Sequence, residues 1–401
     1  MPFRFSWAAA GVIVTALALT ACQSPQPEPP TTPPSPTVAA AGPCPPGDLL
    51  IETTPADQQL LEAQATDYST GCQNRARLTV GSARDGGTTS FVNGLVHIAA
   101  TDLPLADESL RQAETRCLRH PAWHLPVAAD PIAIVFRVDG VTDLSLRPVT
   151  LAKVFSGVIT HWNDPEIAAD NPTVNLPDAR IEVFFRSGRT GATQAVGDYL
   201  NRAAPDAWPV GGTPSWRGAG QARASAQEVF DAVATTANGI GYVEQSQLPQ
   251  PIVGATPTPT PTPTDEPGAG ESSPSASPTP TATQTPDRAT PHQLRLLLEQ
   301  PLELTEATAE AGITALAPRG EGHDLLLASP TEASSGAWPL MRVSYQVVCS
   351  AGQRADLTPL ERDWVTYLVS DDVQDELVDA GRLPLPSTLR ERVRAAATAL
   401  N

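Results

Sequence analysis

The stretch IEVFFRSGRTGATQAVGDYL, residues 181–200, runs from an apolar segment through a polar turn into a predicted helix. Residues 181–185 predict a strand that ends at Arg186. A helix is predicted to begin at Thr190 and Gly191. A strand that leads directly into a helix in this way is the basic unit of α/β folds.

Similar units recur along the chain. Further strands are predicted at residues 49–53, 77–80, 96–100, 131–138, 240–244, 325–328 and 343–349. Further helices are predicted at residues 56–68, 151–158, 225–236, 358–368 and 389–400. This alternation predicts α/β layers with mainly parallel sheets.

Two of these helices carry a capping-box pattern, in which a Ser or Thr is followed three residues later by Glu. The first pattern is formed by Ser225 and Glu228, and the second by Thr358 and Glu361. In the second, Pro359 occupies the first predicted helical position, where proline is favoured.

The N-terminus has the features of an export signal. Arg4 precedes an apolar run at residues 7–19, and small residues precede Cys22. The sequence Leu-Thr-Ala-Cys that ends at Cys22 resembles a bacterial lipobox, which implies lipidation of this cysteine; an ordinary secretory signal or a buried N-terminal helix is the alternative. We therefore predict a signal peptide at 1–21, a Pro-rich tether at 22–44, and a lipid-anchored protein on the extracytoplasmic face of the bacterial cell membrane.

The composition restricts the partners. The chain has 401 residues and a formal net charge of −18, so it has enough residues for a large core and an acidic surface. Such a surface repels nucleic acid, although a local pocket can still bind a small anion. We expect a monomer with no nucleic-acid partner.

Five cysteines are present, and lipidation of Cys22 leaves four for disulfides. Three pairings are possible. We favour Cys44 with Cys72 and Cys117 with Cys349, because the first two lie close in sequence. The chain has no Cys-x-x-Cys motif and its six histidines are scattered, so we expect neither a metal nor a cofactor.

A second Pro-rich segment, residues 255–291, contains a Thr-Pro repeat at 256–264. Its composition predicts an extended, disordered segment. Taken alone, this segment divides the chain into two domains, with a second domain that begins near residue 292.

Several segments in colinear order resemble the phosphate-binding lipoproteins of ABC phosphate transporters. These segments are LAKVFSGVITHWNDPEI (151–167), NPTVNLP (171–177), the strand, RSGRTGAT loop and helix of 181–200, GIGYVE (239–244), WPL (338–340) and LPLP (383–386). The resemblance implies a bilobal periplasmic-binding-protein fold of type II, with two α/β lobes joined by crossover strands.

The resemblance also implies one solute-binding domain at 45–401 instead of two domains. Lobe 1 is expected at about 45–138 and 325–401, and lobe 2 at about 139–250. The Thr/Pro-rich segment is then an insertion on the surface of this body.

The turn before the helix has the chemistry of an oxyanion site. Backbone N–H groups at a helix N-terminus and a guanidinium group both bind anions. The resemblance implies ligand positions at Arg186, Thr190, Gly191 and Ala192. An ordinary polar turn is the alternative.

Three further ligand positions are implied outside this loop: Thr53 at the end of the first strand, Arg84 in the loop 81–87, and Asp102 after the third strand. A carboxylate beside an anion requires a proton on the ligand. Hydrogen phosphate carries this proton and sulfate does not, so Asp102 is expected to favour phosphate. The alternatives are a cap for the turn at Pro104 and a strand-end threonine at position 53.

The chain departs from the family pattern at several positions. Gly188 replaces an aspartate that pairs with the ligand arginine, so Arg186 is expected to be freer. Ala192 replaces a threonine, Arg189 replaces a glycine, and Arg84 replaces a small hydroxyl residue. The added arginines leave three possibilities open: tighter binding of a doubly charged anion, a larger ligand such as a phosphate ester, or a site plugged by Arg84.

The resulting prediction is a solute-binding protein that captures phosphate or a related oxyanion for an ABC permease by lobe closure. The alternative is a non-transport relative with an altered pocket, acting as a sensor or interaction module. No Gly-x-Ser-x-Gly or His-Glu-x-x-His motif is present, so we do not expect an enzyme.

Overall fold

The computed structural model describes residues 44–249, 288–329, 336–352 and 354–401. The predicted signal peptide, Cys22, the tether up to residue 43 and residues 255–287 of the insertion lie outside the described residues. Among the described helices, none combines the length and the apolar character needed to cross a membrane.

The strands are β1 (Gly47–Thr53), β2 (Ala76–Ser82), β3 (Ile98–Thr101), β4 (Ala122–Arg137), β5 (Ser145–Leu146), β6 (Glu182–Arg186), β7 (Gln221–Arg223), β8 (Gly239–Glu244), β9 (His292–Gln293), β10 (Arg295–Leu297), β11 (Pro301–Leu302), β12 (Ala317–Pro318), β13 (Leu327–Ala328) and β14 (Met341–Cys349). The α-helices are α1 (Gln58–Gly71), α2 (Thr88–Val92), α3 (Asp107–Arg116), α4 (Pro148–Ser156), α5 (Pro165–Asp170), α6 (Gly191–Ala203), α7 (Ala226–Thr235), α8 (Glu306–Thr314), α9 (Thr358–Leu368), α10 (Asp371–Asp379) and α11 (Ser387–Ala399).

The main sheet has the strand order β2-β1-β3-β14-β4-β8-β6-β7, and β9 also pairs with β4. The strands β1, β2 and β3 are parallel, as are β6, β7 and β8. Between these groups, β14 and β4 pair in antiparallel fashion with each other and with their neighbours. The expected α/β class is therefore confirmed, but the sheet is mixed and not mainly parallel.

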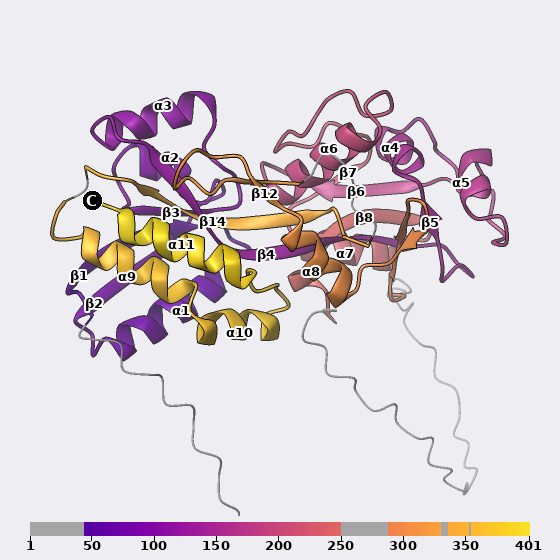
Figure 1. Cartoon of the computed structure of the whole chain (residues 1–401). Helices are drawn as coiled ribbons and strands as arrows, with labels where there is room; N and C mark the ends of the chain where they lie inside the picture. Colours follow the sequence, from indigo (N-terminus) through magenta and orange to yellow (C-terminus); the bar gives the residue numbers. More distant parts are fainter. Residues whose placement is uncertain (1–43, 250–287, 330–335, 353) are drawn as a thin grey trace, which may run out of the picture. The chain divides into compact units, whose positions relative to one another are not determined.

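Strand β4 connects the two halves of this sheet. Its residues 122–131 pair with β14, and its residues 132–137 pair with β8. Figure 1 shows β4 and β14 side by side along much of their length. The sequence predicted a strand only at 131–138, because His124 and Pro126 interrupt the apolar pattern of the preceding half. This long strand gives the architecture expected of a bilobal periplasmic-binding fold; the lobe boundaries themselves stay a prediction.

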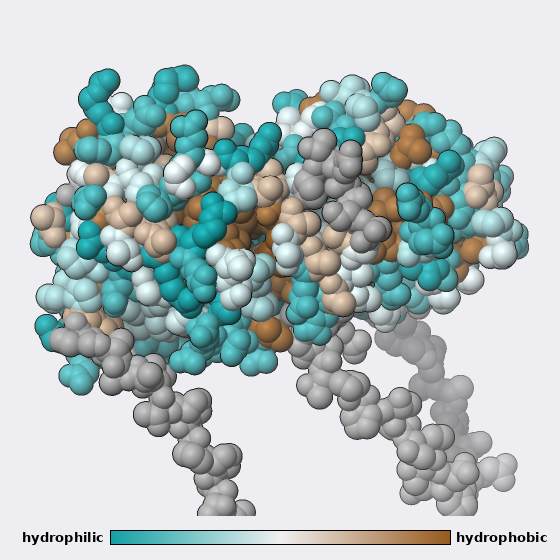
Figure 2. Space-filling view, viewed as in Figure 1, coloured by the Kyte–Doolittle hydropathy of each residue, from teal (hydrophilic) through white to brown (hydrophobic). Residues whose placement is uncertain are grey.

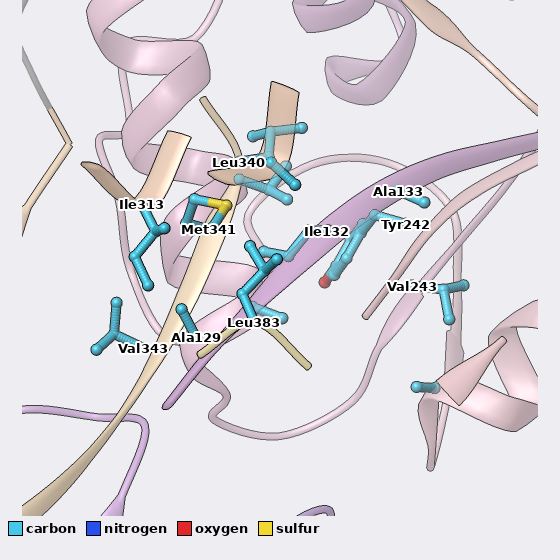
Figure 3. Packing of buried hydrophobic residues seen from close by; sticks show 14 of the residues in the cluster. Ala129, Ile132, Ala133, Tyr242, Val243, Ile313, Leu340, Met341, Val343 and Leu383 are labelled. Carbon is cyan, nitrogen blue, oxygen red and sulfur yellow. The ribbon is translucent and has the colours of Figure 1, made fainter. Parts of the chain in front are cut away.

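The core is continuous where the two halves meet. Figure 3 shows Ile132 of β4 near Leu340 and Met341, Ala129 near Leu383, and Ala133 on the side of Tyr242 of β8. Burial of such apolar side chains contributes about 25 cal/mol per Å² of area removed from water. The segment after the insertion therefore shares its hydrophobic core with strands from the first half of the chain.

The capping boxes have different outcomes. Ser225 caps α7 as predicted, because its side chain accepts a hydrogen bond from the N–H of Glu228 at 3.1 Å. The prediction for Thr358 is wrong. Leu357 is the N-cap of α9, and Thr358 is already the first helical residue. Glu361 points into the core, and neither of its carboxylate oxygens has a hydrogen-bond partner within the part of the chain that the structure describes.

Both predicted disulfides are confirmed. Cys44 bonds to Cys72, and Cys117 bonds to Cys349. The first joins the segment before β1 to the end of α1, and the second joins the end of α3 to the end of β14.

Hydrophilic residues predominate on the face seen in Figure 2, with apolar residues interspersed among them. This mixture is typical of a protein surface in contact with water.

Candidate anion-binding site

The predicted strand–turn–helix unit is confirmed. Strand β6 ends at Arg186, and α6 begins at Gly191. Thr190 is the N-cap, and its Oγ1 accepts a hydrogen bond from the N–H of Thr193 at 3.1 Å. The N-terminus of a helix presents free N–H groups and a partial positive charge, both of which favour an anion.

Asp102 lies at this helix N-terminus. It follows β3, in the other half of the sheet, and its Oδ2 accepts a hydrogen bond from the N–H of Gly191 at 3.0 Å. The next N–H, that of Ala192, has no acceptor among the described residues. The structure therefore brings Asp102, Thr190, Gly191 and Ala192 together, as expected from the sequence.

Gly191 is required for this approach. A Cβ atom at this position would lie 2.5 Å from the carbonyl oxygen of Asp102 and 2.9 Å from its Cγ. Both distances are shorter than van der Waals contact, and Asp102 is held by its own hydrogen bonds. Only glycine lets the two segments come this close.

Arg186 has a carboxylate partner that the sequence did not reveal. Its Nη1 lies 3.2 Å from Oε1 of Glu244, at the end of β8, and only 12% of the Arg186 side chain and 2% of the Glu244 side chain are exposed. The expectation that Gly188 leaves Arg186 freer is therefore wrong. The partner comes from a strand adjacent to β6, which only the sheet order reveals.

Both halves of the sheet contribute buried polar atoms that have no hydrogen-bond partner among the described residues. Thr53, at the end of β1, is fully buried, and its Oγ1 makes no hydrogen bond to any of them. On the other side, the same holds for the buried Nε of Arg186. A buried polar atom without a hydrogen bond destabilises the folded state unless water or a ligand supplies that bond. These atoms therefore fit a site for a polar ligand.

Asp102 also contacts a buried arginine that was not among the predicted site residues. The side chain of Arg342 in β14 is 1% exposed, and its Nε donates a hydrogen bond to Oδ2 of Asp102 at 3.0 Å. It also pairs with Asp57 and lies 3.7 Å from Oδ2 of Asp130. The signal available in the sequence was a charged residue between Met341 and Val343 in an apolar strand.

These charges shift one another's ionisation. Burial raises the pKa of Asp57, but the guanidinium groups of Arg342 and Arg382 outweigh burial and hold that pKa well below its usual range. Burial raises the pKa of Asp130 to about 6, against the opposing effect of the same two arginines. Asp57 is therefore ionised at neutral pH and paired with two cations.

Arg84 is not brought into contact with the other predicted residues. It is exposed in the loop before α2 and makes no hydrogen bond or ion pair with any described residue. In the same loop, Asp85 accepts a hydrogen bond from the N–H of Thr89, in the first turn of α2, at 3.0 Å. An exposed side chain does not fill a pocket, so the geometry does not favour a site plugged by Arg84.

Comparison with known proteins identifies the family of this chain. A family model described as a PBP superfamily domain matches residues 31–372. The phosphate-binding protein PstS 2 of Mycobacterium tuberculosis is 28% identical over 370 residues, which are 88% of this chain and 87% of the relative. The phosphate-binding protein PstS 3 of Mycobacterium leprae is 26% identical over 337 residues, 83% of this chain and 81% of the relative.

A solved structure supports the fold. The periplasmic phosphate-binding protein PfluDING, bound with phosphate, matches with a TM-score of 0.61 at 18% identity, over 87% of this chain and 93% of that one. The expectation that the chain is not an enzyme is confirmed by its family. With a family model matched over most of its length, the chain belongs to the PBP superfamily and is a divergent relative of phosphate-binding proteins, as its motifs predicted.

Proposed function

We propose that this protein binds phosphate between Asp102 and the N-terminus of α6 and delivers it to an ABC permease. The observation that carries the proposal is the contact of Asp102, from one half of the sheet, with the N–H of Gly191, which begins the helix after the strand that ends at Arg186 in the other half. Relatives that align over most of the chain are named as phosphate-binding proteins, which supports the same ligand.

The proposed ligand contacts divide into donors and one acceptor. The N–H groups of Gly191 and Ala192 and the guanidinium group of Arg186 donate to phosphate oxygens. The hydroxyl group of Thr53 adds a donor, and that of Thr190 adds another when it exchanges its present hydrogen bond to Oγ1 of Thr193, at 2.8 Å, for one to the ligand. Asp102 accepts the remaining ligand proton, so the ligand is hydrogen phosphate and not a fully deprotonated anion.

Binding is proposed to work by closure of two lobes, at about 45–138 with 325–401 and at about 139–250. Residues from both lobes contact the ligand, so the ligand stabilises the closed state by its difference in affinity for the closed and open states. The permease would recognise the closed form.

The proposed location is the extracytoplasmic face of the cell membrane. The lipobox-like sequence that ends at Cys22 supports a lipid anchor, and the Pro-rich residues that follow are suited to a tether. The two disulfides support an oxidising compartment.

Calorimetric titration of the anion-stripped protein with phosphate tests the site. Arg186→Ala is expected to weaken phosphate binding by at least about tenfold, because it removes a charge-assisted hydrogen bond. Arg180→Ala is the matched control, since this arginine lies just before β6 and its side chain is 72% exposed. Equal phosphate affinity in both variants would contradict the proposed site.

The second candidate is a sensor or interaction module with an altered pocket. It is favoured by the contact of Asp102 with a donor that the ligand would need, and by Ala192, which lacks the hydroxyl of the family pattern. A correctly folded wild-type protein that binds no phosphate would support this candidate.

A further inference from the structure

Tyr242 carries a buried hydroxyl group close to the proposed anion site. The residue lies in β8, it is fully buried, and its ring belongs to the hydrophobic cluster of Figure 3. Burial raises the pKa of Tyr242 well above its ordinary value, so the hydroxyl group keeps its proton at neutral pH. A buried hydroxyl proton destabilises the folded state unless an acceptor takes it.

Two groups lie within hydrogen-bonding distance of this hydroxyl in the part of the chain that the structure describes. The backbone N–H of Arg186 donates to it at 3.3 Å, and Oγ1 of Thr193 lies 2.6 Å away. A backbone N–H can only donate. Oγ1 of Thr193 is therefore the acceptor that remains for the proton of Tyr242.

Thr193 connects Tyr242 to the N-terminus of α6. Thr193 is buried, and its Oγ1 lies 2.8 Å from Oγ1 of Thr190, the N-cap of this helix. The backbone of Thr190 is also held in place, because its N–H donates to the carbonyl oxygen of Pro214 at 2.9 Å. The hydroxyl groups of Tyr242, Thr193 and Thr190 thus form one chain that leads to the proposed site.

Each hydroxyl group in this chain has a single proton to donate. When Thr190 donates to Thr193, as in this structure, either the proton of Thr193 or that of Tyr242 is left without an acceptor among the described residues. When Thr190 donates to a ligand, Thr193 can donate to Thr190, and Tyr242 can donate to Thr193. Every proton of the chain then has an acceptor, so ligand binding satisfies a buried group that is otherwise left over.

We propose that Tyr242 is a positioning residue for phosphate, which acts through Thr193 to direct the hydroxyl proton of Thr190 onto the ligand. This inference rests on the proposed function. Tyr242 and Thr193 do not touch the ligand in this account. Each hydrogen bond of the chain polarises the next one, which makes Thr190 a stronger donor.

A purely structural role for Tyr242 leads to a different expectation. Such a role would change stability, or it would change phosphate affinity by the same factor whatever residue stands at position 190. A positioning role changes phosphate affinity only while position 190 carries a hydroxyl group.

The test is calorimetric titration of the purified protein, freed of bound anion, with inorganic phosphate. Tyr242→Phe is expected to weaken phosphate binding by about fivefold, because it removes the hydroxyl group that supports the chain. Tyr199→Phe is the matched control, since Tyr199 is buried in α6 and its hydroxyl has no hydrogen-bond partner among the described residues. This control is expected to keep the wild-type affinity.

The residue at position 190 separates positioning from structure. Thr190→Ser keeps both the hydroxyl group and the helix cap, and here Tyr242→Phe is expected to cause the same loss of about fivefold. Thr190→Ala removes the hydroxyl group, and here Tyr242→Phe is expected to cause no further loss.

Substitutions at Thr193 break the same chain at a second point, so the test does not depend on Tyr242→Phe folding correctly. Thr193→Val keeps the shape of the side chain and is expected to weaken phosphate binding about as much as Tyr242→Phe. Thr193→Ser retains a hydroxyl group and is expected to bind phosphate like wild type. Thermal unfolding without phosphate checks that each variant is folded.

The outcomes separate the two proposals. If wild type binds no phosphate, or if Arg186→Ala binds it as tightly as wild type, the proposed site fails and the role of Tyr242 fails with it. If phosphate binds at the proposed site but Tyr242→Phe and Thr193→Val both keep the wild-type affinity, only the role of Tyr242 is overturned. The same holds if Tyr242→Phe weakens binding equally in the Thr190→Ser and Thr190→Ala proteins.

Discussion

The carboxylate of Asp102 accepts a hydrogen bond from the backbone N–H of Gly191, 89 positions further along the chain. One residue follows the third strand of one half of the main sheet, and the other begins a helix in the other half. This contact joins the two halves at the proposed anion site, so substitutions here are expected to affect binding more than folding.

Gly191→Ala is expected to weaken phosphate binding by about tenfold or more. The added Cβ would overlap the backbone of Asp102, so Asp102 and the helix N-terminus could no longer contact one ligand together. The overlap is relieved when the two segments move apart, and alanine is favourable in a helix, so we expect a smaller loss of stability than of affinity. Gly71→Ala is the control, since its Cβ would meet nothing within 4 Å. Unchanged phosphate affinity by calorimetry would refute this prediction.

Glu244→Gln is expected to tighten phosphate binding by about tenfold. The substitution keeps a hydrogen-bond acceptor for Arg186 but removes a buried negative charge near the site, an effect of about 1–2 kcal/mol at an effective dielectric constant of about 20. Glu182→Gln, at the other end of β6, serves as the control. Weaker binding in Glu244→Gln would mean that the charge of Glu244 is needed to orient Arg186.

Glu361 is expected to make stability depend on pH. Burial raises its pKa from 4.5 to about 7, against the opposing effect of Arg116. Between these pH values the folded state binds more protons than the unfolded state, so the free energy of unfolding falls as pH rises through this window, by about 3 kcal/mol in total.

Urea denaturation at a series of pH values checks this expectation. In Glu361→Gln the fall due to Glu361 should disappear, and the variant should be more stable than wild type above pH 7. Glu391→Gln, an exposed change on α11, should keep the wild-type pH profile. A Glu361→Gln profile parallel to that of wild type would contradict the assignment.

The two disulfides are expected to contribute unequally. Cys44 and Cys72 are 28 positions apart, whereas Cys117 and Cys349 are 232 apart. Replacing each pair by serine should lower the free energy of unfolding by about 3.5 kcal/mol for the shorter loop and about 5.5 kcal/mol for the longer one, because the unfolded chain regains the entropy of loop closure. Urea denaturation of the two double variants measures the loss in free energy of unfolding for each. A larger loss on replacing Cys44 and Cys72 than on replacing Cys117 and Cys349 would contradict this prediction.

The sequence predicts elements whose determinants are local. The strand–turn–helix unit at the anion site follows from apolar residues that lead into a turn and a capped helix, and the structure confirms it. The disulfide pairing followed from the short separation of Cys44 and Cys72.

Features that depend on neighbours distant in sequence could not be predicted. The partner of Arg186 is Glu244 because β6 and β8 are adjacent in the sheet. Glu361 matched a capping pattern, but α9 begins at Thr358 and turns this carboxylate into the core. Arg342 gave a local signal, a charge within an apolar strand, but its three carboxylate partners come from distant segments.

The central claim is that this chain binds phosphate at the contact of Asp102 with the N-terminus of α6. The most direct measurement is calorimetric titration of the wild-type protein, freed of bound anion, with phosphate, and with chloride at matched ionic strength. We predict saturable binding of one phosphate per chain and no binding of chloride. A folded protein that releases or takes up no measurable heat with phosphate, and that gains no thermal stability from it, would contradict the account.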